Sequence, residues 1–375
     1  MKVYLVGGAV RDRLLSLPTQ EHDWVVVGAT PEDLIDQGYR QVGKDFPVFI
    51  HPKNGEEYAL ARTERKSGKG HQGFIVHSEP TITLEEDLSR RDLTINAIAE
   101  DSDGNLIDPY QGQKDLQKKI LRHISPAFAE DPLRVLRVAR FAAKFWILGF
   151  TIAPETLNLM SELSSGDELS YLSKERVWQE TERALLTDNP EIFFLILWQV
   201  GALHFFTKSL AEALDYSENL LHLADVKKLD GLHARYIGLS MVAALNSDRV
   251  DNDIIKQFNQ ELHAPSLLQE FATLSAKYFY ACTQALSLSN ERVHDTLSGL
   301  DAFRRPDRCK EILICIEQTQ FYFGLGAVDS IIFLRNIIPQ LNQIKPDNDL
   351  KSLSGSEIGE VITQLRIEKI KELKP

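Results

Sequence analysis

The sequence contains little cysteine and no long apolar run. Its 375 residues include only Cys282, Cys309 and Cys315, without the spacing of a zinc site or the density of a disulfide framework. The longest apolar stretch, Ile192 to Trp198, is far shorter than the roughly 20 residues needed to cross a bilayer. Met1 to Asp12 has no apolar signal-peptide core. We therefore expect a cytoplasmic chain without membrane partners, whose cysteines are buried as small hydrophobic side chains.

Basic residues are also in short supply, since 42 Lys+Arg face 54 Asp+Glu and the net charge is -12. An acidic chain is at first sight a poor ligand for nucleic acid. The excess of acidic residues is unevenly distributed along the chain, however, because residues 1–150 hold 20 Lys+Arg against 22 Asp+Glu. Most of the acidity belongs to the remainder of the chain, so the N-terminal part keeps basic clusters that are suited to an anionic partner.

The apolar pattern changes near residue 122. Before it, short β-rich runs alternate with turns and short helices; after Pro132, a 3.6-residue periodicity dominates. The sequence predicts an α+β fold in which a small mixed β-sheet with a few helices is followed by helices alone. The expected strands are Val3–Val6, Trp24–Val27, Pro47–His51, Glu57–Ala61, Ile95–Ala99 and Leu106–Ile107, and the clearest helices are Leu133–Phe145, Lys174–Leu186 and Ile192–Phe206.

Two short motifs near the N-terminus have the chemistry of phosphate and metal binding. Gly7 and Gly8 follow a predicted strand and open a helix, where the backbone can approach a phosphate and Arg11 can add a charged fork. Glu21 and Asp23 are two residues apart, which on a strand puts both carboxylates on one face, suited to Mg²⁺. Alone, the first motif is better explained as a turn without a ligand and the second as a solvated strand edge; together they favour two-metal phosphoryl transfer.

Two further motifs supply paired and periodic arginines. The first, Arg90-Arg91-Asp92, precedes a Leu-Thr-Ile-Asn-Ala run. The second, Glu130-Asp131-Pro132, opens a helix on which Arg134, Arg137, Arg140 and Lys144 fall within one sector of about 120°. Solvated helix faces would explain either motif on its own. The acidic residues of the second would also suit the first turn of any helix.

The ordered set of motifs resembles that of the tRNA nucleotidyltransferases, the CCA-adding enzymes of the bacterial and eukaryal class, and most closely their proteobacterial branch. The set runs from Gly7 through Asp108-Pro109-x-x-Gly112 to Glu175-Arg176-Val177-Trp178, and the likeness is thin beyond about residue 200. It implies a catalytic nucleotidyltransferase head over 1–122, a helical neck with a nucleotide-template helix over 123–210, and a tRNA-binding helical body and tail over 211–375.

The resemblance implies template-independent addition of C, C and A to the 3′ end of tRNA, with CTP, ATP and tRNA as partners. Gly8 and Arg11 would contact the triphosphate, while Glu21 and Asp23 would be the catalytic pair that holds Mg²⁺. The family has Asp at the position of Glu21, and the extra methylene could displace the carboxylate by enough to slow the reaction. We expect a monomer, with a dimer as the alternative.

The resemblance also assigns the nucleotide base to the template helix. Arg91, Arg137 and Arg140 would contact the bound nucleotide, and Asp131 with Arg134 would form a protein template. A carboxylate accepts the exocyclic amine of cytosine or adenine while a guanidinium donates to the neighbouring ring acceptor. Uracil and guanine present a carbonyl there, which the carboxylate repels, so the site would bind CTP and ATP and reject UTP and GTP.

Other functions within the same class stay open. A poly(A) polymerase or a partial CC-adding or A-adding enzyme is possible, although the stretch Arg62–Phe74 looks like the flexible loop that CC-adding forms tend to lack. A catalytically degenerate tRNA-binding paralogue, disabled by Glu21, is the non-enzymatic alternative. Extension assays with each nucleotide would separate these possibilities.

Relatives in the same branch often carry a metal-dependent phosphohydrolase with a His-Asp pair in the C-terminal half. Where that motif would align, this chain has Ser240-Met241, so we expect the hydrolase activity to be absent. His222, His233 and His263 are then ordinary surface or packing residues.

Overall fold

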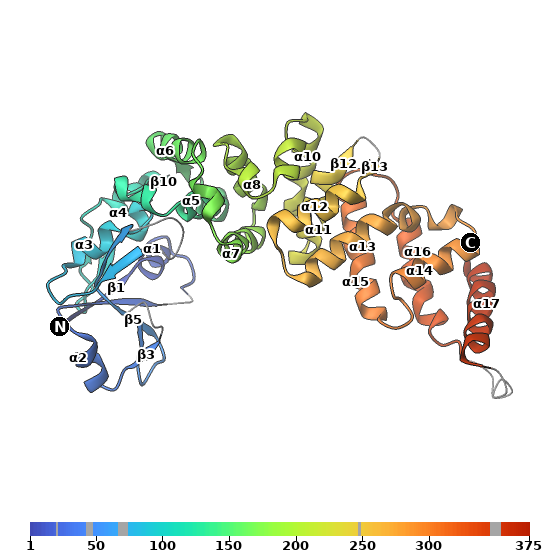
Figure 1. The fold of residues 1–375 in the computed structure, drawn as a ribbon, viewed down its shortest axis with the longest axis horizontal. Helices are drawn as coiled ribbons and strands as arrows, with labels where there is room; N and C mark the ends of the chain where they lie inside the picture. The colour runs from blue at the N-terminus through green and yellow to red at the C-terminus, as the bar shows by residue number, and fades with distance from the viewer. Residues whose placement is uncertain (20–21, 43–47, 67–73, 247–248, 346–353) are drawn as a thin grey trace. The chain divides into compact units, whose positions relative to one another are not determined.

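Strands dominate the first hundred residues and helices the rest, as the colour gradient of Figure 1 shows for the computed structural model. The structure describes residues 1–19, 22–42, 48–66, 74–246, 249–345 and 354–375. These residues form two compact units, 1–206 and 207–375. The α+β class is confirmed. The division into three parts, head, neck and body, remains a prediction, because the contacts between residues separate only two units.

Seven strands of the described residues form the mixed sheet of the N-terminal unit. All neighbouring pairs are antiparallel except β2 and β5, which run parallel with Asp23 opposite Glu57. The order across the sheet is β3 (Arg40–Val42), β4 (Val48–Ile50), β5 (Glu57–Leu60), β2 (Asp23–Val27), β1 (Lys2–Val6), β8 (Ala99–Glu100) and β9 (Leu106–Ile107).

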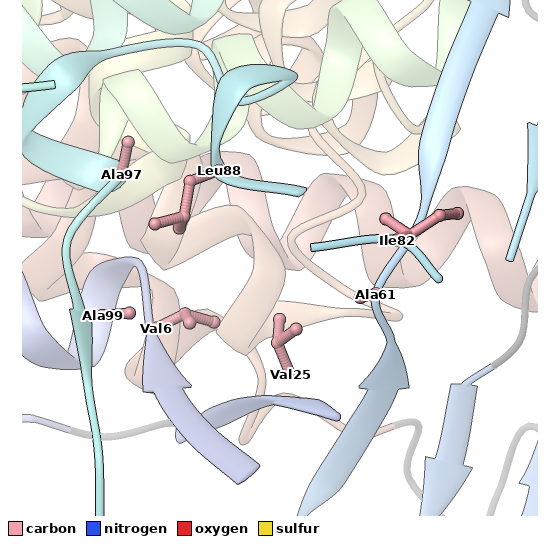
Figure 2. Close-up of a cluster of buried hydrophobic side chains, with 7 residues drawn as sticks. All are labelled: Val6, Val25, Ala61, Ile82, Leu88, Ala97 and Ala99. Atoms are coloured by element: carbon pink, nitrogen blue, oxygen red, sulfur yellow. The ribbon is translucent and has the colours of Figure 1, made fainter. Parts of the chain in front are cut away.

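The alternation of β2 divides its side chains between two small cores. Val26 packs with Leu34 of α2 (Pro31–Asp36) and Leu60 on one face. Val25, on the other face, belongs to the buried cluster drawn in Figure 2, which also contains Val6, Ala61, Ile82, Leu88, Ala97 and Ala99. Since side chains two residues apart share a face, Asp23 lies on the side of Val25.

Helices and short ladders complete the N-terminal unit. A capping box at Thr30 starts α2, and Pro132 precedes α5, as expected for helix starts. The other ladders are antiparallel β6 (Thr63–Lys66) with β7 (Phe74–His77) and parallel β10 (Ile120–Leu121) with β11 (Thr151–Ile152). The remaining helices are α1 (Gly8–Leu14), α3 (Leu84–Ser89), α4 (Gly112–Lys118), α5 (Leu133–Phe145), α6 (Pro154–Ser164), α7 (Lys174–Leu185) and α8 (Pro190–Gln199).

Two expected elements are wrong in extent. The strand expected over Ile95–Ala99 begins only at Ala99, because Thr94–Asn96 forms a 3₁₀ turn whose Asn96 side chain donates to Asp92 Oδ1 at 2.8 Å. The helix expected over Ile192–Phe206 ends at Gln199, since Gly201 has a φ of 76° and reverses the chain.

The C-terminal unit is built around α11 (Gly231–Ala244), which is buried from Tyr236 to its end. Helices α9 (Lys208–Ala213), α12 (Asn252–Leu262), α13 (Ser266–Thr283) and α15 (Pro306–Tyr322) pack against it. A two-residue ladder, β12 (Leu245–Asn246) with β13 (Arg249–Val250), follows α11. The other helices are α10 (Ser217–Asp225), α14 (Asn290–Gly299), α16 (Asp329–Leu341) and α17 (Gly355–Leu373).

The three cysteines are buried and unpaired, and burial raises the pKa of Cys309 and Cys315 to about 12, as expected for apolar packing. Within the part of the chain that the structure describes, no helix is long and apolar enough to span a membrane.

The three histidines that the sequence analysis named in the C-terminal unit have ordinary surroundings. His222 stacks on Phe323 at 4.9 Å, His233 pairs with Glu311 at 2.5 Å, and His263 ends α12 with a φ of 51°. Ser240 and Met241 are buried in α11, where the Ser240 hydroxyl donates to its own helix. Absence of the hydrolase activity stays a prediction for a phosphatase assay.

Candidate active site

A cavity of about 550 Å³ lies in the N-terminal unit, with walls from the Gly7–Gly8 turn, β2, the Arg90–Asp92 segment, α5 and α7. The described site residues predicted from the sequence all line it: Gly8, Arg11, Asp23, Arg91, Asp131, Arg134, Arg137 and Arg140. Glu21 lies outside the described residues. Arg62, Arg90, Lys144, Arg176 and Arg183 add further basic lining, so the cavity is strongly cationic although the whole chain is acidic.

The glycine turn is shaped by a close contact with the second arginine of the Arg-Arg-Asp motif. Gly7 has a φ of 72°, and a Cβ there would lie 2.7 Å from Nη1 of Arg91. A side chain would therefore meet both a strained backbone and the guanidinium. Arg11, one turn into α1, is itself held by Asp12 at 2.7 Å and by Asn96 Oδ1 at 2.5 Å.

Asp87, a residue that the sequence reasoning did not single out, anchors the arginine pair. Its fully buried carboxylate accepts from Arg90 at 2.9 Å, from Arg91 at 3.5 Å and from the backbone N–H of Arg62 at 3.2 Å. Burial alone would raise the pKa of Asp87, but the two guanidinium charges hold it below its usual 3.8. Asp87 thus holds both arginines in place, and the Arg91 guanidinium points at the glycine turn.

Two further acids, Asp92 and Glu180, hold the basic stripe of α5. Asp92 accepts from Arg137 Nε at 2.7 Å, while Glu180 of α7 accepts from Arg140 Nε at 2.5 Å and lies 3.7 Å from Arg137. Burial opposes ionisation of Asp92, yet Arg137 and the Asn96 amide keep its pKa well below the ordinary value. Phe141 also supports the stripe through a cation–π contact, since the Arg140 guanidinium lies 4.3 Å from its ring centroid.

Asp131 and Arg134, the expected template pair, have other partners in this structure. One Asp131 oxygen accepts from the Leu133 N–H at 3.1 Å, and the other pairs with Arg176 of α7 at 2.9 Å. The guanidinium of Arg134 donates to the carbonyls of Ala127 at 2.7 Å and Arg90 at 2.5 Å. Each side chain keeps hydrogen-bonding capacity beyond these contacts, and both stay at the cavity wall.

Asp23 is the described member of the expected metal pair. Its exposed side chain lines the cavity, and its carboxylate has no hydrogen bond or ion pair among the described residues. Glu57, opposite Asp23 in the parallel register of β2 and β5, places a second carboxylate residue on the same face of the sheet. Free oxygen ligands of this kind suit a hard divalent cation.

The sequence reasoning missed Asp87, Glu180 and Glu57, and it gave no role to Asn96, which stands in the run after the Arg-Arg-Asp motif. The signal for Asp87 was its spacing three and four residues before the paired arginines, which on a helix brings opposite charges together. Glu180 lies four residues after Arg176, just beyond the Glu175-Arg176-Val177-Trp178 motif. Glu57 had no local signal, because its neighbour in space is 34 residues away in the chain.

Comparisons with known proteins identify the family to which the chain belongs. Residues 3–122 match the "Poly A polymerase head domain" family model, and residues 149–214 match the "Probable RNA and SrmB- binding site of polymerase A". The "CCA-adding enzyme" of Pseudomonas putida is 46% identical over 98% of each chain, and the "Multifunctional CCA protein" of Hahella chejuensis is 43% identical over 100% of this chain and 96% of its own. The chain belongs to the CCA-adding enzyme family.

Solved structures show that the fold is that of the CCA-adding enzymes. The Bacillus stearothermophilus CCA-adding enzyme in complex with CTP has a TM-score of 0.72 at 23% identity, covering 99% of this chain and 89% of the other. The Thermotoga maritima CCA-adding enzyme complexed with tRNA has a TM-score of 0.65 at 22% identity, covering 98% and 87%. Members of this nucleotidyltransferase family generally use divalent metal ions.

Proposed function

We propose that this member of the CCA-adding enzyme family adds C, C and A to the 3′ end of tRNA, using CTP and ATP. One observation supports the proposal: a single cationic cavity is lined by Asp131 and Arg134, by the Gly7–Gly8 turn and by the Asp23 carboxylate. Such a cavity can select a nucleotide without a nucleic-acid template, because the protein itself presents the complementary hydrogen-bonding groups.

Base selection belongs to Asp131 and Arg134. The Asp131 carboxylate accepts the exocyclic amine of cytosine or adenine, and Arg134 donates to the adjacent ring nitrogen. Arg176 and the Leu133 N–H hold the carboxylate from one side, and two carbonyls hold the Arg134 guanidinium. A pair positioned in this way discriminates well, since neither group must be ordered when the nucleotide binds.

Arg91, Arg137 and Arg140 contact the sugar and phosphates of the nucleotide, while Gly8 and Arg11 contact the triphosphate. The buried acids Asp87, Asp92 and Glu180 fix these guanidinium groups, and because Asp87 also pairs with Arg90, four guanidinium charges face three carboxylates. Contacts of this type carry no base information, so they serve CTP and ATP alike.

Asp23 and Glu21 would hold Mg²⁺, and the register of Glu57 makes it a third candidate ligand. The unpaired Asp23 carboxylate at the cavity wall fits a hard cation. Bound Mg²⁺ supplies activation of the tRNA 3′-hydroxyl and neutralisation of phosphate charge. The residues of the cavity orient the α-phosphate and the base, so that the hydroxyl meets the nucleotide in one geometry.

The C-terminal helical region, which we delimit as 211–375, binds tRNA, and the neck over 123–210 carries the template helix. Incubating the purified protein with tRNA that lacks its 3′ terminus and with each nucleotide separately tests the function. We expect two additions with CTP alone, completion only when ATP follows, and none with UTP or GTP. Long runs of A would indicate a poly(A) polymerase. Binding of tRNA without extension would indicate a degenerate paralogue.

A further inference from the structure

Arg183 differs from every other basic side chain that lines the cavity. The others have partners: acids hold Arg90, Arg91, Arg137, Arg140, Arg176, Arg11 and Lys144, carbonyls hold Arg134, and Arg62 is engaged as well. Arg183 is exposed and has no hydrogen bond or ion pair within the described part of the chain. No motif used above includes it.

The position of Arg183 follows from the face of α7 that packs on α5. Arg176, Glu180 and Arg183 are four and three residues apart, so they share that face. Arg176 pairs with Asp131 before α5 begins, and Glu180 pairs with Arg140 in the middle of α5, so residue numbers rise together along the two helices. Arg183 therefore lies one turn further on, toward the last basic residue of the stripe, Lys144.

This end of the cavity also holds the glycine turn. Lys144 Nζ lies 3.1 Å from Asp12, whose other oxygen is 2.7 Å from Arg11, one turn after Gly7 and Gly8. Burial and the charge of Arg11 lower the pKa of Lys144, which marks a site crowded with positive charge. An anion would relieve that crowding, and the unpaired Arg183 guanidinium is free to bind it.

We propose that Arg183 binds the triphosphate of the incoming nucleotide, in the cavity that the Gly7–Gly8 turn also lines. This inference rests on the proposed function, and it adds to the triphosphate site a residue that the family motifs did not name. An exposed guanidinium that lines the cavity can form two parallel hydrogen bonds to phosphate oxygens without first breaking an ion pair.

The test is equilibrium binding of CTP, ATP and inorganic pyrophosphate to the full chain without tRNA, at fixed Mg²⁺ and ionic strength. Arg183→Ala is expected to raise all three dissociation constants by a similar factor of about 10, the loss of a charge-assisted contact. Arg183→Lys keeps the charge but not the forked pair of donors. Its dissociation constants are expected to lie between those of wild type and Arg183→Ala. Lys174→Ala is the matched control, because Lys174 is exposed on the same helix but does not line the cavity.

Unchanged binding of pyrophosphate and both nucleotides by Arg183→Ala would overturn the proposal. So would a rise in the KM for tRNA with unchanged nucleotide binding, because the guanidinium would then contact the RNA backbone. Thermal denaturation of each variant verifies that its fold is intact. Binding is measured apart from extension, so a failure to extend tRNA would count against the proposed function while the pyrophosphate result still decides on Arg183.

Discussion

Replacing Asp131 by alanine should remove base discrimination and leave nucleotide binding in place. Asp131 is the one described carboxylate at the start of α5 that faces the cavity, and Arg134 lies beside it. A lost bidentate base contact corresponds to about 1 to 3 kcal/mol, so the preference for CTP over UTP should fall by roughly 5-fold to 150-fold. Incorporation of CTP itself should also slow.

The ion pair with Arg176 provides a matched control. Asp131 and Arg176 are 2.9 Å apart, with side chains about one-fifth exposed, so either alanine variant leaves a mostly buried charge without its ion-pair partner. The free energy of unfolding should fall by about 1 to 3 kcal/mol in both, a shift of several degrees in Tm for a unit of this size. Only Asp131→Ala also removes the base-reading carboxylate.

The assay is single-nucleotide extension of tRNA with CTP or UTP, at one salt concentration, for wild type, Asp131→Ala and Arg176→Ala. The reasoning predicts a collapsed CTP/UTP ratio in Asp131→Ala and a much smaller change in Arg176→Ala. If both variants lose stability and both keep the wild-type ratio, Asp131 is only a helix-start residue and the template assignment is refuted.

Three further predictions concern acids of the N-terminal unit. Asp23→Ala should abolish incorporation of both CTP and ATP while tRNA binding stays nearly intact, and substantial residual turnover would contradict the metal assignment. Glu21→Asp should change the single-turnover rate less than about tenfold; recovery from near zero would instead identify Glu21 as the lesion of a degenerate enzyme. Because the pKa of Asp92 is depressed, its stabilising effect is present above its unfolded pKa near 3.8 and is lost as the pH falls below that value. Tm should therefore decline less steeply in Asp92→Asn than in wild type between about pH 4 and about pH 2, and parallel curves would count against the Asp92–Arg137 pair.

Local signals carried much of the fold and of the site. Pro132 and the 3.6-residue period predicted α5 over Leu133–Phe145, and the structure has the same bounds. The basic stripe on that helix does face the cavity. Such features can be read from the sequence because capping and periodicity involve only residues within a few positions of one another.

The remainder depends on contacts between distant parts of the chain. The pairing of Asp131 with Arg176 joins residues 45 positions apart, and Glu57 reaches the side of Asp23 only through the parallel register of β2 and β5. The error at Ile95–Ala99 has the same origin, since the Asn96 side chain bonds to Asp92 and turns an apolar run into a 3₁₀ turn. A run of β-formers does not reveal such a tertiary constraint.

The most direct test of the central claim is sequencing of tRNA 3′ ends after reaction with all four nucleotides at equal concentrations. The tRNA begins without its last three nucleotides, and the purified full chain is the only enzyme present. If one cavity reads cytosine and adenine through Asp131 and Arg134, the product ends are C-C-A and extension stops there. Unextended ends, frequent U or G, or a continuing run of A would contradict the account.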